Sequence, residues 1–261
     1  MHKYPRTRHI RGSRLQVGDH DLSAAPFDVL RGRHLVVEEK LDGANAGVGF
    51  GPGGGLRLQS RGHYLTGGPR ERGFGPFKAW AATVAPTLWP RLGERYVLYG
   101  EWLYAKHTVF YDRLPHYFCE FDVLDTSEGA FLSTRRRREL LAGTPVVSVP
   151  VLYEGSIASL DALTALVGPS LYRSEVWHEA LSEAAVAGGV APERALTETD
   201  TSDLMEGLYV KVEEGDLTVD RYKWVRSGFT SALSNSGGHW MNRPLIANAL
   251  ADPEVLYAGV H

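Results

Sequence analysis

The chain has 261 residues, of which 43% are hydrophobic and 23% charged, a composition typical of a soluble globular protein with a sizeable core. Its formal net charge of −3 excludes a globally basic nucleic-acid-binding protein, so any surface of that kind must be local. The single cysteine, Cys119, excludes an internal disulfide, and no apolar run is long enough to cross a bilayer, so a cytoplasmic protein is expected.

The first part of the chain favours strands and glycine-rich turns. Residues 34–40 and 46–50 are predicted to be strands on either side of a short turn. Residues 56–62 alternate apolar and polar side chains, as expected of a strand returning from a hairpin turn at residues 51–55. The glycine-rich residues 62–75 are predicted to form a loop.

Helices and strands alternate in the next part of the chain. Residues 76–92 suggest a helix that Pro86 limits, because proline cannot donate the helical hydrogen bond. Residues 95–104 and 117–125, rich in aromatic and β-branched side chains, indicate two strands. Residues 133–143 begin with Ser-Thr and end with glycine, which predicts a short helix.

The remaining elements complete a mixed α+β protein. Residues 146–155 are predicted to be one strand, and the alanine-rich residues 159–200 two or three helices. Residues 207–226 suggest a β-hairpin. The sum is an α+β fold with antiparallel sheets.

Lys40 is the candidate nucleophile. It lies in the string EEKLDGAN, between Glu39 and Asp42, at the end of a hydrophobic strand. A lysine amine attacks only when uncharged, so burial or neighbouring cations must lower its pKa. Gly43 would let a flat ring or a phosphate approach the backbone closely. A lysine flanked by two carboxylates can equally be a solvated salt-bridging residue, so this motif needs support from the rest of the chain.

The string EKLDGAN resembles motif I of the covalent nucleotidyltransferase superfamily, which contains ATP-dependent DNA ligases, RNA ligases and mRNA capping enzymes. The motif lysine of that family attacks the α-phosphate of ATP, releases pyrophosphate and carries AMP as a phosphoramidate. The resemblance gives this role to Lys40. Five further strings resemble later motifs, in the family's order: SRGH (60–63), YGEW (99–102), EFDVLD (120–125), EGLYVK (206–211) and RYKWVR (221–226).

The resemblance assigns a role to residues within these strings. Arg61 would contact the nucleotide and the 5′-phosphate strand, and Glu101 would hold the ribose. Phe121 would stack on the adenine, with Phe118 as the alternative. Glu206 would bind the catalytic metal ion, for which Mg²⁺ or Mn²⁺ is expected because a carboxylate oxygen is a hard ligand.

Two lysines complete the predicted catalytic group. Lys211 would face the phosphates of ATP, and Lys223 would contact the α-phosphate, with Arg221 or Arg226 adding charge. These cations would neutralise the charge that develops at the α-phosphorus, and they would also favour the neutral form of the nucleophile.

Residues around motif I resemble the RNA-repair branch of the superfamily, which contains phage and kinetoplastid RNA-editing ligases. The pattern EKxxGxN is present, and it implies that Glu39 recognises the adenine amino group and that Asn45 acts in the sealing steps. Only residues 227–261 follow motif V, fewer than the roughly 100 residues of an OB-fold. We therefore expect an RNA ligase without an OB-fold.

The resemblance implies an ATP-grasp-like nucleotidyltransferase domain built on two antiparallel β-sheets with flanking helices. It would occupy residues 1–230, with a basic N-terminal segment and a helical insertion near 159–200, followed by a short extension at 231–261. The expected activity is ATP-dependent RNA ligation in RNA repair. Expected partners are RNA ends carrying a 5′-phosphate and a 3′-hydroxyl, and a polynucleotide kinase or phosphatase that prepares them.

Three alternatives stay open at this point. A minimal ATP-dependent DNA ligase and a GTP-using capping-type enzyme would carry similar motifs. An inactive nucleic-acid-binding scaffold could keep the same fold. The run Arg135–Arg138 could bind RNA phosphates, or it could be a solvated first turn of a helix.

Overall fold

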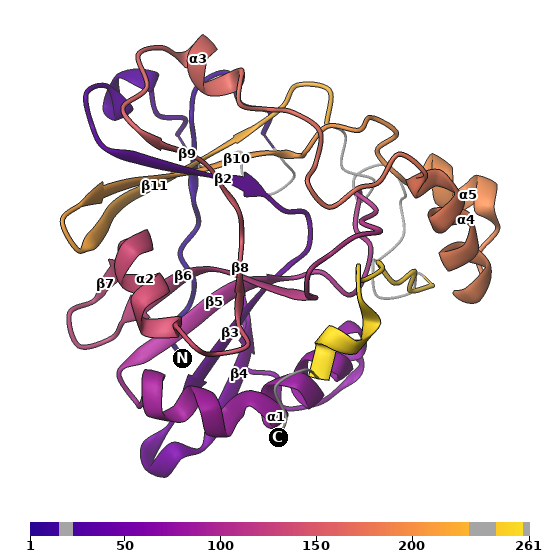
Figure 1. Cartoon of the computed structure of the whole chain (residues 1–261), viewed down its shortest axis with the longest axis horizontal. Helices are drawn as coiled ribbons and strands as arrows, with labels where there is room; N and C mark the ends of the chain where they lie inside the picture. Colours follow the sequence, from indigo (N-terminus) through magenta and orange to yellow (C-terminus); the bar gives the residue numbers. More distant parts are fainter. Residues whose placement is uncertain (16–22, 230–243, 258–261) are drawn as a thin grey trace.

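The computed structural model describes residues 1–15, 23–229 and 244–257, and they form the mixed α+β fold expected from the sequence (Figure 1). Its strands are Arg8–His9 (β1), Leu35–Lys40 (β2), Ala44–Phe50 (β3), Leu56–Ser60 (β4), Tyr96–Trp102 (β5), Phe118–Asp125 (β6), Ala130–Leu132 (β7), Val147–Ser148 (β8), Val151–Gly155 (β9), Gly207–Glu214 (β10) and Leu217–Val225 (β11). Its α-helices are Gly75–Leu92 (α1), Thr134–Leu141 (α2), Leu160–Thr164 (α3), Trp177–Ala187 (α4) and Pro192–Thr197 (α5).

The strands form one large, mainly antiparallel sheet with the order β4-β3-β5-β6-β7-β11-β10-β2-β9, rather than the two separate sheets that we expected. The short strand β7 joins the halves, because Phe131 pairs with Leu124 of β6 and with Thr218 of β11. In Figure 1 the half with β2, β9, β10 and β11 lies above the half with β3 to β6. A strand of three residues is too short to show alternation in the sequence.

Two pairings in this sheet are parallel and were not predicted. β1 lies parallel to β11, and β8 lies parallel to β6. The predicted single strand over residues 146–155 is wrong, since it divides at Pro150 into β8 and β9. β8 pairs with β6 in one half of the sheet and β9 pairs with β2 in the other. Proline has no N–H for a strand ladder, so the chain crosses between the halves at this residue.

Helix α1 continues through Pro86 and also contains Pro90, so the predicted limit at Pro86 is wrong. Its buried residues recur every three or four positions and include Phe77, Trp80 and Val84. They pack on one face of β3 and β5, in the largest apolar cluster of the described residues. The burial of this apolar face outweighs the roughly 3 kcal/mol that an internal proline costs a helix.

The predicted helical region at 159–200 contains α3, α4 and α5, with α4 and α5 packed on each other. The expected extension at 231–261 lies partly outside the described residues. Its described part runs along the loop between β5 and β6, where Ala247 bridges Ala105 and Leu250 bridges Leu114. No helix among the described ranges is long and apolar enough to cross a membrane.

Candidate active site

Lys40 is the last residue of β2 and pairs with Gly207 of β10. Side chains alternate across a strand, and directly paired residues share a face, so Lys40 lies on the same face as Tyr209 and its partner Lys223. The Lys40 ammonium donates to Glu206 Oε2 at 2.6 Å. Its side chain is 22% exposed, whereas that of Glu206 is fully buried. The predicted nucleophile and the predicted metal ligand are therefore in direct contact.

The pKa of Lys40 is raised, which is the opposite of what the sequence predicted. Burial alone would lower this pKa, but the attraction of the Glu206 and Glu101 carboxylates outweighs burial. The cations that were expected to favour the neutral amine are not the dominant neighbours. Lys40 is therefore protonated at neutral pH in this state, and its proton must leave before it can attack a phosphate.

Glu101 of β5 lies directly opposite Asn45 of β3, beside the turn that follows Lys40. Its Oε1 accepts a hydrogen bond from the backbone N–H of Gly43 at 3.0 Å. Burial raises the pKa of Glu101 to about 7, although Lys40 acts in the other direction. The Oδ1 atom of Asn45 is buried and has no hydrogen-bond partner among the described residues. A buried acceptor without a partner is expected where a ligand supplies the donor.

The packing of the protein requires a glycine at position 43, whatever ligand approaches it. A Cβ atom at this position would lie 2.7 Å from the carbonyl oxygen of Trp102 and 2.8 Å from Leu103 Cδ2. A glycine is therefore required for the turn between β2 and β3 to lie against the end of β5.

The buried side chain of Glu39 points away from Lys40, to the other face of β2. Its two carboxylate oxygens accept hydrogen bonds from Ser170 Oγ at 2.6 Å and from the Leu171 N–H at 3.2 Å. Burial raises its pKa to about 7, and no cation offsets that effect. The expected contact with an adenine amino group would have to be made from a carboxylate that Ser170 and Leu171 already hold.

Replacing Glu39 by glutamine is expected to stabilise the protein at pH 8 and to leave its stability at pH 4 nearly unchanged. The Glu39 carboxyl has a pKa of 4.5 in the unfolded chain and about 7 in the folded protein, so ionising it destabilises the fold. This destabilisation is complete above pH 7 and disappears below pH 4.5. That shift corresponds to at most about 3 kcal/mol. Glutamine can still donate to Ser170 Oγ and accept from Leu171. Urea unfolding of both proteins at the two pH values measures the difference, and equal stabilities at pH 8 would contradict it.

The two candidate adenine-stacking residues occupy different environments. Phe118 is fully buried between Phe77 and Trp80 of α1, with ring centroids 5.4 and 5.0 Å away, so it belongs to the core. Phe121 is partly exposed and lies 5.4 Å from Tyr4 and 5.7 Å from Tyr209. Of these two candidates, only Phe121 keeps ring surface accessible to a base.

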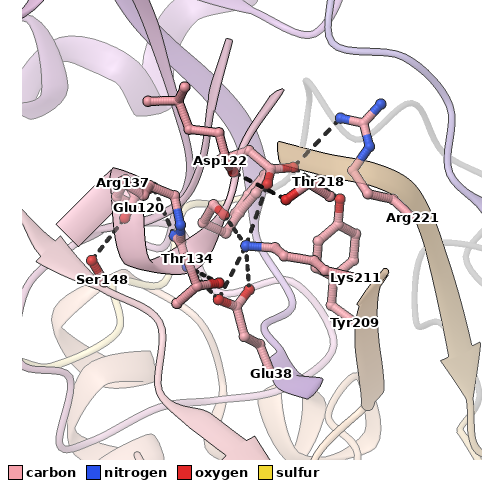
Figure 2. Close-up of polar contacts among 12 residues, drawn as sticks. Glu38, Glu120, Asp122, Thr134, Arg137, Ser148, Tyr209, Lys211, Thr218 and Arg221 are labelled. Carbon is pink, nitrogen blue, oxygen red and sulfur yellow. Dashed lines mark hydrogen bonds and ion pairs between the residues drawn. The ribbon is translucent and has the colours of Figure 1, made fainter. Parts of the chain in front are cut away.

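Lys211 lies in a buried ion network rather than at a phosphate site (Figure 2). Its ammonium is 3.0 Å from Glu38 Oε2 and 3.3 Å from Asp122 Oδ1, and it also donates to the carbonyl of Phe121. Arg137 joins the network through Glu38 and Glu120 at 2.6 and 2.7 Å. These carboxylates hold the Lys211 ammonium away from solvent in this state, whereas the sequence interpretation placed it facing the phosphates of ATP.

Of the remaining predicted cations, two lie near the candidate site and two form ion pairs with carboxylates. Lys223 is 7% exposed and shares the face of Lys40. Arg61 is exposed and directly follows Ser60, which pairs with Ala46. Because Asn45 directly precedes Ala46, Arg61 and Asn45 lie at the same end of β3 and β4. The two arginines that were expected to add charge are held by carboxylates instead, Arg221 by Asp122 and Arg226 by Asp200.

The carboxylates around Lys40 fit a hydrated metal ion bound with a phosphate. Glu206, Glu101 and Asp42 all act electrostatically on Lys40. Within the described ranges, however, no three His, Cys, Asp or Glu side chains are arranged to hold a metal by themselves. Mg²⁺ usually keeps several waters and takes one or two carboxylates plus substrate phosphates, so Glu206 remains a suitable ligand.

The arginine run at the start of α2 has a structural explanation for three of its four members. Arg137 is fully buried, as described above. Arg135 and Arg136 form ion pairs with Glu139 and Asp216. The helix itself begins with a conventional cap, since Ser133 Oγ accepts from the Arg136 N–H.

Asp42 and Tyr111 are the site neighbours that the sequence interpretation missed. Asp42 Oδ2 accepts from the N–H groups of Thr108 and Val109 at 2.6 and 2.8 Å, and the Asp42 N–H donates to the Tyr111 hydroxyl at 2.8 Å. Burial lowers the pKa of the adjacent His107, despite the attraction of Asp42. No motif marks residues 107–111, so only the fold reveals that they contact the turn after Lys40.

Comparisons with known structures agree with this fold. Three structures of the Naegleria gruberi RNA ligase are similar: two mutants with AMP and Mn, and one protein with PPi. The first mutant is 16% identical, with a TM-score of 0.51 over 76% of this chain and 51% of that one. The second is 14% identical, with a TM-score of 0.52 over 86% and 56%. The PPi structure is 16% identical, with a TM-score of 0.51 over 86% and 56%.

The chain thus spans about half the length of the solved structures it matches, and at this identity the likeness shows the fold alone. A search of the curated proteins found no match. The family model described as RNA ligase matches residues 33–225, which is most of the chain and includes every predicted site residue except the alternative cation Arg226. The chain therefore belongs to the RNA ligase family.

Proposed function

We propose that this protein is an ATP-dependent RNA ligase whose nucleophile is Lys40. The observation that carries the proposal is the arrangement at the end of β2, where the Lys40 amine contacts Glu206 and lies in the field of Glu101. Family membership supports the same function, and so do the similar structures of the Naegleria gruberi RNA ligase with AMP and Mn and with ATP and Mn.

The proposed reaction begins at Lys40 Nζ, which must first lose a proton; Glu206 Oε2, already at 2.6 Å, is an available acceptor. The neutral amine attacks the α-phosphorus of ATP, an N–P bond forms, and the bond to the β-phosphate breaks as pyrophosphate leaves. AMP then passes to an RNA 5′-phosphate, and the N–P bond breaks. A 3′-hydroxyl attacks that phosphate, a phosphodiester forms, and AMP leaves.

The other residues hold the reactants in this scheme. Lys223 and Arg61 would neutralise phosphate charge, and Glu101 would bind the ribose. Phe121 would stack on the adenine, a contact worth about 1–3 kcal/mol on nucleobase estimates. A bound Mg²⁺ or Mn²⁺ would offset the phosphate charge and orient the pyrophosphate leaving group. Lys211 has no contact with ATP in this proposal; it fixes the strand that carries Phe121.

Further parts of the proposal extend to the whole molecule. We propose a nucleotidyltransferase domain over residues 1–230 and no OB-fold, RNA ends with a 5′-phosphate and a 3′-hydroxyl as substrates, and a role in RNA repair. A polynucleotide kinase or phosphatase would prepare such ends. A cytoplasmic location is consistent with the single, buried, free cysteine Cys119.

Labelled ATP tests this proposal. Wild-type protein incubated with α-labelled ATP and Mg²⁺ should form a covalent adduct that survives a denaturing gel and is released by acid, and Lys40→Ala should form none, which is a loss of more than about 10³-fold if Lys40 is the nucleophile. Labelled GTP should give no adduct. Sealing of matched RNA and DNA nicks then separates the RNA ligase from a minimal DNA ligase. An adduct of equal yield in Lys40→Ala would contradict the proposal.

A further inference from the structure

A path of hydrogen bonds connects the C-terminal part of the chain with the turn that follows Lys40. The Asp42 N–H donates to the Tyr111 hydroxyl at 2.8 Å, and the Tyr111 N–H donates to Asn248 Oδ1 at 2.9 Å. Tyr111 is fully buried, so water does not replace either contact. Tyr111 thus joins the nucleophile's turn to a residue 137 positions later in the chain.

Asn248 is 2% exposed, and four hydrogen bonds hold it. Besides accepting from Tyr111, its side chain donates through Nδ2 to the carbonyl of Leu103 at 2.7 Å. Its own N–H donates to the carbonyl of Tyr104 at 2.9 Å, and its carbonyl accepts from the Tyr117 hydroxyl at 2.9 Å. A side-chain amide can both accept and donate in this way, whereas a carboxylate or a hydrocarbon side chain cannot.

The loop at residues 103–114 is therefore held from two sides. On one side Asp42 Oδ2 accepts from the N–H groups of Thr108 and Val109. On the other side the C-terminal segment, which we define as residues 244–251, runs along the loop; Lys106 N donates to Ile246 O at 2.8 Å. This segment carries none of the ligase motifs, and nothing in the sequence links it to Lys40.

We propose that Asn248 and Tyr111 are positioning residues for Lys40: the C-terminal segment fixes the 103–114 loop, and the Tyr111 hydroxyl fixes the turn from which Lys40 attacks. The role rests on the proposed function, since it concerns the same transfer of AMP. Two backbone N–H groups of the turn at residues 41–43 are then fixed, that of Asp42 by Tyr111 and that of Gly43 by Glu101. A nucleophile held this way spends more of its time in the geometry for attack.

Tyr111→Phe is the most direct variant, because it removes one hydroxyl and keeps the buried ring. The single-turnover rate of Lys40 adenylylation at saturating ATP should fall about tenfold, with the half-saturating ATP concentration about unchanged. Thr218→Val is the matched control. It also removes one buried hydroxyl, which donates to Leu132 O at 3.0 Å. Thr218 lies near the start of β11, whereas the end of β11 at Val225 is the one that pairs with Gly207 beside Lys40. The rate of this control should equal that of the wild type.

Two more measurements separate positioning from a general loss of structure. The double variant Tyr111→Phe with Asn248→Ala should react no more slowly than Asn248→Ala alone, because both act through one path. Hydrogen exchange of the peptide 40–46 should accelerate in Tyr111→Phe and not in Thr218→Val, whether or not ATP is added.

Unchanged exchange together with a wild-type rate in Tyr111→Phe would overturn the positioning role while leaving the proposed function intact. Independent, multiplying effects of the two substitutions would also overturn it. A wild-type protein that forms no AMP adduct would instead overturn the proposed function, and the positioning role of Tyr111 and Asn248 with it.

Discussion

Arg137→Ala is expected to lower the free energy of unfolding by about 3–5 kcal/mol, a large effect for a single substitution. The guanidinium is fully buried between Glu38 and Glu120, which lie 2.6 and 2.7 Å away and are also fully buried. Alanine would leave both carboxylates without this partner. Burial already raises the pKa of Glu38, and Lys211 and Arg137 act against that rise.

The neighbouring Arg138→Ala is the matched control for this prediction, since Arg138 is exposed on the same helix. It should change stability by less than about 0.5 kcal/mol, as surface substitutions usually do. The difference between the variants should also shrink at low pH. Without Arg137 the pKa of Glu38 in the folded protein rises further. The resulting loss of stability is complete above that raised pKa and disappears below the pKa of Glu38 in the unfolded chain. Urea unfolding at pH 4.5 and 8 tests both statements, and equal stabilities of the two variants would contradict them.

Glu206→Gln is expected to slow the adenylylation of Lys40 on the order of 10²-fold or more, the largest effect on activity apart from removal of Lys40 itself. Glutamine can still accept from the Lys40 ammonium, but it removes the anionic ligand that would help hold the metal ion and the acceptor for the amine's proton. Glu213→Gln is the control, because Glu213 lies in the same strand β10 and contacts Thr134 rather than Lys40.

The pH profile of Glu206→Gln carries a second signature. Burial lowers the pKa of Lys40, and Glu206 is the largest of the influences that raise it. Without that charge the pKa falls, so the rising limb of the rate against pH should move to lower pH while the maximal rate drops. Single-turnover rates between pH 6 and 11, a range that spans the ordinary lysine pKa of about 10.4, would show both changes. A profile identical to the wild type would exclude the Lys40–Glu206 pair from the reaction.

The order of short motifs was sufficient to find most of the candidate site. Lys40, Glu101 and Glu206, which lie far apart in the chain, meet at one end of the sheet. The choice of Phe121 over Phe118 as the stacking residue stays a prediction; Phe118 is fully buried in the core, whereas Phe121 is partly exposed. These residues were accessible from sequence because the motifs are local strings, each on a strand or at its end.

The positions of charged side chains were less predictable, because ion pairs join distant parts of the chain. Lys211 was assigned to the phosphates from its motif, but its partner Glu38 lies 173 residues away and holds it in the core. The direction of the Lys40 pKa shift was wrong for the same reason. It depends on which charges surround the amine in three dimensions, and carboxylates outweigh cations there.

Two features of the fold escaped prediction for physical reasons. Strands β1, β7 and β8 have two or three residues each, so their sequences carry no pattern, and their pairing depends on the longer strands beside them. The link from Asp42 through Tyr111 to Asn248 consists of single hydrogen bonds between distant residues. Composition and periodicity report neither kind of contact.

Mass-spectrometric mapping of the AMP-modified peptide tests the central claim most directly. Wild-type protein reacted with ATP and Mg²⁺, digested under conditions that preserve the phosphoramidate, should carry AMP on the peptide that contains Lys40, with fragment ions that place it on that residue. AMP on another residue, such as Lys211 or Lys223, or a protein without AMP, would contradict the account.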